Sequence, residues 1–201
     1  VCNAQPAVVP TRLGNLALAH NGNLVNASVL REELLERDHD LITTTDSEMI
    51  ALALAEAVND GYDWVNGAEK AFRRCEGAFS LVIGTPEGIL GARDPQGIRP
   101  LVLGVLAEDA DLPDEGAPAH YVLASETCAL DIIGATYLRD ILPGELVWIT
   151  ERGISSYQWA EKTQRRLCVF EMIYFSRPDS IVNDESLYSY RRRLGHQLAK
   201  E

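Results

Sequence analysis

The residues best suited to chemistry lie at positions 16–24, where an apolar run ends at Asn21 and Gly22. We expect a buried strand that stops at a tight polar turn, because glycine tolerates positive φ and Asn-Gly is a favoured turn pair. Such a turn can aim the Asn21 side-chain amide and the Gly22 backbone N–H at one point. Two such donors are what an oxyanion hole requires. The alternative is an ordinary hairpin turn, for which Asn-Gly is the strongest short signal.

A second candidate segment, residues 43–48, lies between two stretches with helical periodicity. Thr45 followed at the third position by Glu48 is the signature of a capping box, so a helix is predicted to begin there. Asp46 would lie in its first turn. A carboxylate at that position is either stabilised by the helix dipole or available to bind a cationic group.

Together these segments resemble the AHNGNL and TTSDSE motifs of the amidophosphoribosyltransferases, glutamine phosphoribosylpyrophosphate amidotransferases. The resemblance covers almost the whole chain, because it continues through residues 93–101, 124–131 and 168–180. The Asn-Gly motif is shared by several amidotransferases with an N-terminal nucleophile. The segments 93–101 and 168–180, by contrast, look specific to this family.

The resemblance implies that Asn21 and Gly22 form the oxyanion hole for glutamine hydrolysis and that Asp46 binds the substrate ammonium group. It also implies a nucleophilic cysteine at the mature N-terminus, with its own α-amine as base. Cys2 does not fit this role, because Val1 precedes it. The family arginine that holds the glutamine carboxylate would lie upstream. We therefore expect an internal fragment that is inactive as a glutaminase by itself.

Cys168 matches a family cysteine that is one of four ligands to a [4Fe-4S] cluster in cluster-bearing members. The alternative is a small apolar side chain in a core, because one cysteine specifies no metal site. Mg²⁺ is expected to accompany the phosphoribosylpyrophosphate substrate. His20 is expected to be structural, Cys75 and Cys128 to lie in the core, and the run 191–193 to be a solvated helix face.

Composition limits the classes of partner. With 18 Lys and Arg against 30 Asp and Glu, the net charge of -12 argues against nucleic acid or an anionic membrane as the main partner. No run approaches the ~18 apolar residues of a membrane span. The four cysteines form no CxxC pair, so reduced thiols and a cytoplasmic location are expected. We expect glutamine and phosphoribosylpyrophosphate as partners, and a homo-oligomer.

Hydrophobic periodicity predicts a layered α+β domain. Asn26 should cap a helix over 27–37 with Val29, Leu30, Leu34 and Leu35 on one face. Further helices are expected from 45 to about 60, over 63–76 and over 128–133, the last capped by Ser125. Meander strands are expected over 78–85, 89–93 and 98–105, a solvated loop over 107–119, and strands over 120–124, 146–150 and 154–159.

The resemblance implies the αββα sandwich of N-terminal-nucleophile hydrolases, here incomplete. Residues 1–163 would form the glutaminase domain, and residues 164–201 the junction and start of a phosphoribosyltransferase domain, with a helix over 187–200. The implied reaction is that of a glycosyltransferase of purine biosynthesis: glutamine, phosphoribosylpyrophosphate and water give phosphoribosylamine, glutamate and pyrophosphate. The alternatives are another type 2 amidotransferase, such as a glucosamine-phosphate synthase, and a non-catalytic interaction module with the same fold.

Overall fold

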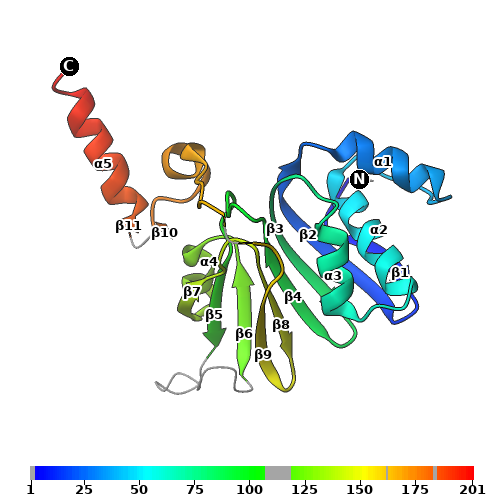
Figure 1. Cartoon of the computed structure of the whole chain (residues 1–201). Helices are drawn as coiled ribbons and strands as arrows, with labels where there is room; N and C mark the ends of the chain where they lie inside the picture. The colour runs from blue at the N-terminus through cyan, green and yellow to red at the C-terminus, as the bar shows by residue number, and fades with distance from the viewer. Residues whose placement is uncertain (1–2, 107–118, 162, 183–184) are drawn as a thin grey trace.

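Two stacked antiparallel sheets with helices on both outer faces make up most of the molecule (Figure 1). The structure is a computed structural model that describes residues 3–106, 119–161, 163–182 and 185–201. The larger sheet has the strand order β1-β2-β3-β4-β8-β9. Its strands are β1 Ala7–Thr11, β2 Gly14–Leu24, β3 Gly77–Thr85, β4 Gly88–Arg93, β8 Glu145–Thr150 and β9 Gly153–Gln158.

Three helices cover one face of the larger sheet: α1 Ala27–Glu36, α2 Asp46–Asn59 and α3 Trp64–Phe72. The middle helix, α2, packs on β1 and β2 and against both of its neighbours. A helix enclosed in this way needs apolar residues nearly all round, and Ile50 and Leu54 of α2 are indeed fully buried. They share the main core with Leu16 and Leu18, which alternate on β2 and therefore face the helices.

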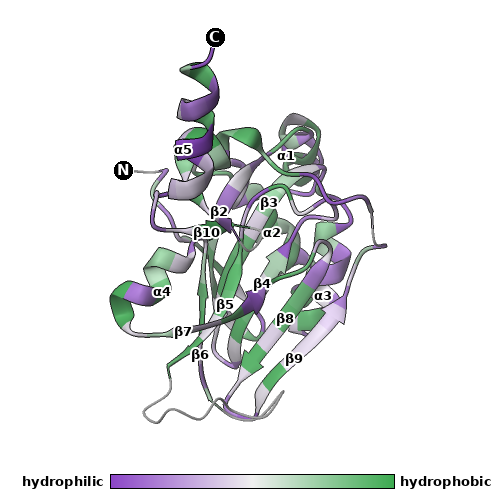
Figure 2. Ribbon diagram, turned by 90° about the vertical axis from the view of Figure 1, so that its left-hand side faces the viewer, coloured by the Kyte–Doolittle hydropathy of each residue, from purple (hydrophilic) through white to green (hydrophobic). Residues whose placement is uncertain are grey.

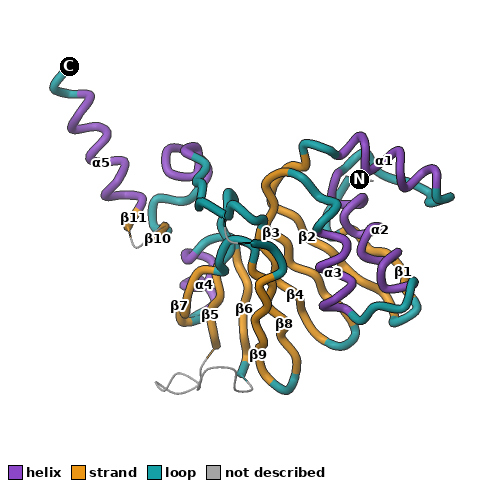
Figure 3. The backbone as a smooth tube through the Cα atoms, in the orientation of Figure 1, coloured by secondary structure: helices purple, strands orange, loops and turns teal. Residues whose placement is uncertain are grey.

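A smaller sheet with the order β6-β5-β7 packs on the opposite face (Figure 3). Its strands are β5 Val102–Leu106, β6 His120–Ala124 and β7 Thr136–Asp140. Leu103 of β5 packs with Val147 and Ile149 of β8 between the two sheets. The short helix α4, Thr127–Ile133, covers the outer face, where Leu130 packs against Val102. The layers therefore have the αββα order that the resemblance implies.

The chain then leaves the sandwich through the π-helix η1 Glu171–Phe175, the short strands β10 Ile181–Val182 and β11 Glu185–Ser186, and the helix α5 Leu187–Leu198. Figure 2 shows that α5 carries largely hydrophilic residues and extends away from the sheets. It contacts only η1 and β11 extensively among the described elements. The predicted helix over 187–200 is thus confirmed. A domain boundary at residues 163 and 164 stays a prediction. None of the described helices is long and apolar enough to cross a bilayer.

The predicted turn at Asn21 and Gly22 is wrong. β2 continues through both residues to Leu24, and its pairing with β3 runs without a shift through Asn21↔Ser80 and Gly22↔Phe79. Only glycine fits at position 22, because a Cβ there would lie 2.0 Å from the Ala78 carbonyl oxygen. The glycine therefore serves a close approach of two strands instead of a turn.

The predicted capping box does not form, although α2 does begin after Thr45. The Thr45 side chain makes no capping hydrogen bond. Glu48 reaches further back, where its carboxylate accepts hydrogen bonds from the N–H groups of Ile42 and Thr43, each at 2.8 Å. Glu48 consequently fixes the segment before α2, and Asp46 follows this segment as the first residue of the helix.

Several other element predictions need correction. α1 buries Leu30 and Leu34 but leaves Val29 and Leu35 about half exposed. Asn26 makes no capping bond, because its amide pairs with the Arg74 carbonyl and the Glu76 N–H. α3 ends at Phe72, earlier than predicted, and Glu126 instead of Ser125 precedes α4.

The predicted meander is also wrong. β5 leaves β4 and joins the smaller sheet, so β4 pairs with β8 instead. β7 was not predicted. The loop predicted over 107–119 lies almost wholly outside the described residues.

Candidate functional site

The end of β2 forms an open strand edge. β1 begins at Ala7, opposite Leu18, so no described strand lies beside residues 19–24 on that side. There the His20 N–H donates to the Gln5 side-chain oxygen at 2.6 Å, and the Leu24 N–H donates to Asp46 at 2.9 Å. Backbone N–H groups alternate along a strand. The Gly22 N–H, midway between these two, therefore points to the same open edge and is placed to receive an oxyanion.

The Asn21 side chain projects from the sheet face opposite the helices and contacts the loop between β4 and β5. Its carbonyl oxygen accepts two hydrogen bonds from Arg99, from Nε at 3.0 Å and from Nη2 at 2.8 Å. Its amide nitrogen lies 3.4 Å from the Ser125 hydroxyl, a long hydrogen bond. The amide N–H groups thus point away from Arg99, and among the described residues only this long hydrogen bond engages them.

Asp46 lies at the first residue of α2 and touches residues on both sides of Asn21 and Gly22. One carboxylate oxygen accepts the Leu24 N–H, and the other lies 3.4 Å from His20 Nδ1. Burial by itself would raise the pKa of Asp46. The hydrogen bonds from His20 and Leu24 outweigh it and hold the pKa below its usual value. Asp46 is therefore ionised at neutral pH. A carboxylate has room for further donors, so this one can also accept an ammonium group.

The three predicted residues therefore share one location. His20 and Leu24, the two residues that Asp46 contacts, are four positions apart on β2, and a strand rises by about 3.3 Å per residue. Asn21, Gly22 and Asp46 accordingly lie within a span of roughly 13 Å. The structure brings all three residues together.

His20 was expected to be structural, with its ring fully satisfied. Its side chain is 1% exposed, and Nδ1 contacts both Asp46 and the Ser47 hydroxyl. Nε2 is buried and has no hydrogen-bond partner among the described residues. The ring thus orients Asp46 through Nδ1, and only one of its two nitrogens has a hydrogen-bond partner among the described residues.

Sequence reasoning missed three residues that fix this location. Gln5 bridges the edge of β2, since its amide also donates to the His20 carbonyl at 2.9 Å. Asn3 donates to the Thr44 hydroxyl at 3.0 Å and ties the start of the chain to the segment before α2. Arg99 donates two hydrogen bonds to the Asn21 carbonyl oxygen. Arg99 lies in the motif at residues 93–101, and this is the signal by which it could have been found.

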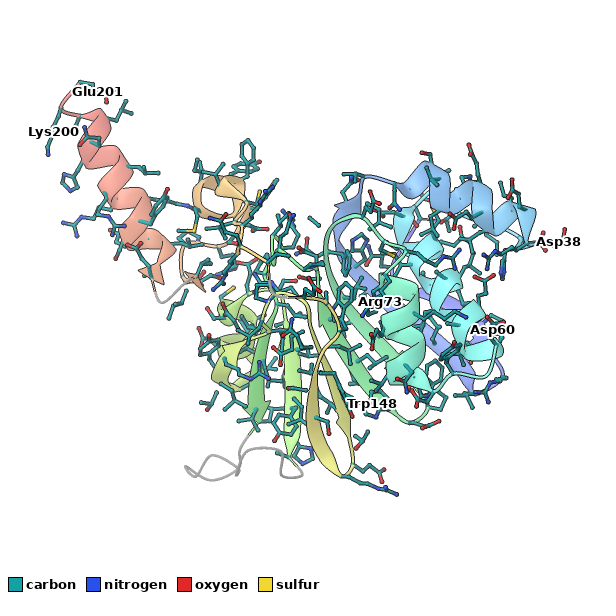
Figure 4. The ribbon with its side chains drawn as sticks, in the orientation of Figure 1. Asp38, Asp60, Arg73, Trp148, Lys200 and Glu201 are labelled. Carbon is teal, nitrogen blue, oxygen red and sulfur yellow. The ribbon has the colours of Figure 1, made fainter. Side chains whose placement is uncertain are left out.

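A separate cavity of about 350 Å³ lies between α3, β8 and β9, lined in part by Trp64, Trp148 and Trp159. Figure 4 labels Trp148 on the outer side of β8. The cavity does not include Asn21, Gly22 or Asp46. The geometry of the open strand edge, not a deep cavity, therefore marks the candidate site.

Cys168 lies just before η1 and is partly exposed. Within the described ranges, no three His, Cys, Asp or Glu side chains are grouped so that they could hold a metal ion. Cys75 and Cys128 are buried, as predicted. The described residues therefore supply one accessible thiol for a metal site and no second one beside it.

The arginine run 191–193 is only partly the solvated face that was predicted. Arg191 donates to the carbonyl oxygens of Met172 at 2.8 Å and Ser176 at 2.6 Å. Arg193 pairs with Glu185. Arg191 therefore holds α5 against η1, and is occupied by protein groups.

Comparison with known proteins gives the same picture over the whole chain. A family model described as a glutamine amidotransferase domain matches residues 2–112, more than half of the chain. The amidophosphoribosyltransferase of Synechocystis sp. is 66% identical over 99% of this chain and 39% of its own length. The human amidophosphoribosyltransferase is 39% identical over 99% of this chain and 41% of its own length.

Among solved structures, the glutamine phosphoribosylpyrophosphate amidotransferase of B. subtilis, complexed with ADP and GMP, superposes with a TM-score of 0.88 at 37% identity. The match covers 99% of this chain and 41% of that one. The chain thus spans about two fifths of the length of these relatives. From the family match and the fold, we conclude that this chain belongs to the glutamine amidotransferase domain family.

Proposed function

We propose that this chain is the glutamine-hydrolysing part of an amidophosphoribosyltransferase. The observation that carries the proposal is the convergence of Asn21, Gly22 and Asp46 at the open end of β2. The reaction of the whole protein would convert glutamine, phosphoribosylpyrophosphate and water into phosphoribosylamine, glutamate and pyrophosphate. Relatives with that name match both the segment 93–101 and the segment 168–180, which favours this assignment over a glucosamine-phosphate synthase.

The site residues have two different roles: Asn21 and Gly22 stabilise the charge that develops during the reaction, and Asp46 binds the substrate. As a nucleophile adds to the side-chain amide, the carbonyl oxygen gains negative charge, and the Asn21 amide and Gly22 N–H stabilise it. The ionised Asp46 binds the substrate ammonium group, which carries its charge throughout the reaction. The first interaction acts mainly in the transition state, and the second acts equally in the ground state.

Two substitutions test these roles in the enzyme that carries this chain. Asn21→Ala should lower the glutamine-dependent kcat about 100-fold with little change in KM, as the loss of one oxyanion donor does. Asp46→Ala should chiefly raise the KM for glutamine. Synthesis of phosphoribosylamine from ammonia bypasses the glutaminase and should survive both. If either variant abolished the ammonia-dependent reaction as well, the assignment to glutamine hydrolysis would be refuted.

We also propose that Cys168 ligates a [4Fe-4S] cluster whose other thiolates come from residues outside the described ones. Its partial exposure at the junction leaves the thiol accessible to such ligands. A cluster of this kind would contribute to folding, because ligand binding and folding are coupled. Protein purified without oxygen should contain about four iron atoms per chain, and Cys168→Ser should lose the iron and become less soluble. A fully active, iron-free wild type would place Cys168 among the plain apolar side chains.

The remaining features of the proposal follow from the reaction. Mg²⁺ would accompany phosphoribosylpyrophosphate, as divalent ions do with phosphate groups. We propose a cytoplasmic homo-oligomer that binds neither nucleic acid nor membranes, in keeping with a net charge of -12. Metal dependence of synthesis and the mass of the native assembly test these two points.

A further inference from the structure

The role of the motif at residues 93–101 follows from the contacts of Arg99. We infer that Arg99 is the positioning residue for the oxyanion hole: it fixes the orientation of the Asn21 amide so that its N–H groups face the substrate. The inference rests on the proposed function, in which Asn21 is an oxyanion donor. It adds a residue to that site which does not itself contact glutamine.

The orientation of the Asn21 amide follows from the chemistry of arginine. An amide group can be turned by 180° with little change in shape, and only its partners decide which end is oxygen. A guanidinium has donors and no acceptor, so the atom that faces it must be the carbonyl oxygen. Arg99 makes two hydrogen bonds to that oxygen, at 3.0 and 2.8 Å. The Asn21 N–H groups are therefore forced to the opposite side.

The positive charge of Arg99 strengthens the effect. Hydrogen bonds from an ionised donor are roughly twice as strong as neutral ones. A charge on the carbonyl end polarises the amide, which makes its N–H groups better donors toward a developing oxyanion. The 3.4 Å contact with Ser125 is too long to hold these N–H groups strongly.

Arg99 is itself held on its far side by the π-helix η1. Nη1 lies 2.9 Å from Glu171, whose side chain is only 4% exposed, and the guanidinium lies 5.1 Å from the centre of the Phe175 ring. The other Glu171 oxygen accepts the Ser176 hydroxyl at 2.8 Å. With Asn21 on one side and Glu171 on the other, the guanidinium has a single compatible placement.

The backbone of Arg99 is fixed by the rest of the motif. Its carbonyl accepts hydrogen bonds from the buried Arg93, at 2.7 Å from Nε, and from the Ser80 hydroxyl at 2.9 Å. The Asp94 carboxylate accepts the N–H groups of Gln96 at 2.9 Å and Ile98 at 3.0 Å. The backbone of the loop between β4 and β5 is thus fixed by hydrogen bonds on both sides of Arg99, and this loop carries the side chain that orients Asn21.

The test is a double-substitution cycle in the whole enzyme. Arg99→Met should lower the glutamine-dependent kcat about 10- to 100-fold, leave the KM for glutamine unchanged and spare the ammonia-dependent reaction. In an Asn21→Ala background, the same substitution should cause no further loss, because its target is gone. Arg99→Lys keeps the charge but not the two-pronged contact, and should retain more activity than Arg99→Met. Arg152→Met, at an arginine that is exposed in the turn between β8 and β9, is the matched control.

The possible results distinguish a failure of the role inferred for Arg99 from a failure of the proposed glutamine-hydrolysing function. Equal losses from Arg99→Met with and without Asn21 would overturn the inference, because Arg99 would then act independently. A parallel loss of glutamine- and ammonia-dependent synthesis would overturn it too, by revealing a general structural role. A wild-type enzyme with no glutaminase activity would refute the proposed function itself. Glu171→Gln weakens the hold on Arg99 and should give a smaller kcat loss, again with KM unchanged.

Discussion

Replacing Arg93 by methionine should destabilise the chain severely, although methionine nearly matches the apolar stem of arginine. Arg93 is 2% exposed, and its guanidinium donates to three carbonyl oxygens: Arg99 and Ile141 at 2.7 Å and Gly97 at 2.8 Å. Each hydrogen bond from a charged group contributes on the order of 1.5–3 kcal/mol, and an orphaned buried carbonyl costs a similar amount. Contributions of this kind add incompletely, so we expect a loss of about 4 kcal/mol or more.

The opposing effect is the cost of burying the charge. Burial lowers the pKa of the Arg93 guanidinium, which reflects that cost, and some buried ions can be replaced by apolar residues without loss of stability. Here the Ile141 and Gly97 carbonyls would stay behind without the donors that Arg93 supplies, whereas the Arg99 carbonyl would keep the Ser80 hydroxyl. The two orphaned carbonyls decide the sign of the change in stability. Because a domain has only about 5–15 kcal/mol of stability, the variant should be marginal.

Urea unfolding of the 201-residue polypeptide, followed by tryptophan fluorescence, measures the loss. Trp159 is a suitable probe, because its indole N–H donates to the Arg93 carbonyl at 3.2 Å. Arg152→Met is the control, because Arg152 is exposed in the turn between β8 and β9, where a substitution usually changes stability by less than about 0.5 kcal/mol. A loss below about 1.5 kcal/mol at Arg93 would show that the cost of burying the charge cancels its hydrogen bonds.

Three further predictions concern packing, reactivity and pH. Gly22→Ala should destabilise far more than Gly195→Ala, since a Cβ at Gly22 meets the Ala78 oxygen at 2.0 Å and one at Gly195, inside α5, meets nothing within 4 Å. Thermal unfolding measures both shifts, and equal shifts would show that the two strands can part. Burial raises the pKa of the Cys75 thiol to about 12, so brief alkylation at pH 8 should label the partly exposed Cys168 and leave Cys75 unmodified in mass spectra of the folded protein. Burial alone would raise the pKa of Glu145, but hydrogen bonds from Arg139 and the Leu142 N–H hold it lower. That stabilisation is present above the unfolded pKa near 4.3 and is lost as pH falls through the folded value, so Glu145→Gln should unfold more easily at pH 7 and show a shallower further loss in acid.

Local patterns predicted the helical layer and most of the strands, because each element depends on a few consecutive residues. They also placed Asp46 at the start of α2, whereas the turn predicted at Asn21 proved to be part of β2. The four-layer order, by contrast, came from the family resemblance. Periodicity alone indicated only a layered α+β domain.

Long-range partners could not be predicted from local patterns. The local preference of an Asn-Gly pair is for a turn, and here the pairing of β2 with β3, which lies far along the sequence, imposes a strand instead. Thr45 and Glu48 have capping-box spacing, but the Glu48 carboxylate accepts hydrogen bonds from the N–H groups of Ile42 and Thr43 and therefore does not cap the helix at Thr45. Arg99 was part of a recognised motif, yet its role depends on Asn21 and Glu171, which only the tertiary structure brings to it.

The departure of β5 from the larger sheet also has a consequence for the order of folding. β1 pairs with β2, and β3 with β4, through short turns, whereas β2 meets β3 only after residues 25–76 have closed into a long connection. Likewise, β8 can pair with β4 only after residues 94–144 have closed into a loop. That closure costs entropy before any β8 contact repays it, and the cost is reduced once the smaller sheet has formed within the loop. The ends of the loop are then fixed to each other, since the Gly144 N–H donates to the Asp94 carbonyl at 2.9 Å. The segment that carries Arg99 joins the two sheets, so the contact of Arg99 with Asn21 forms only when this second closure has brought the sheets together.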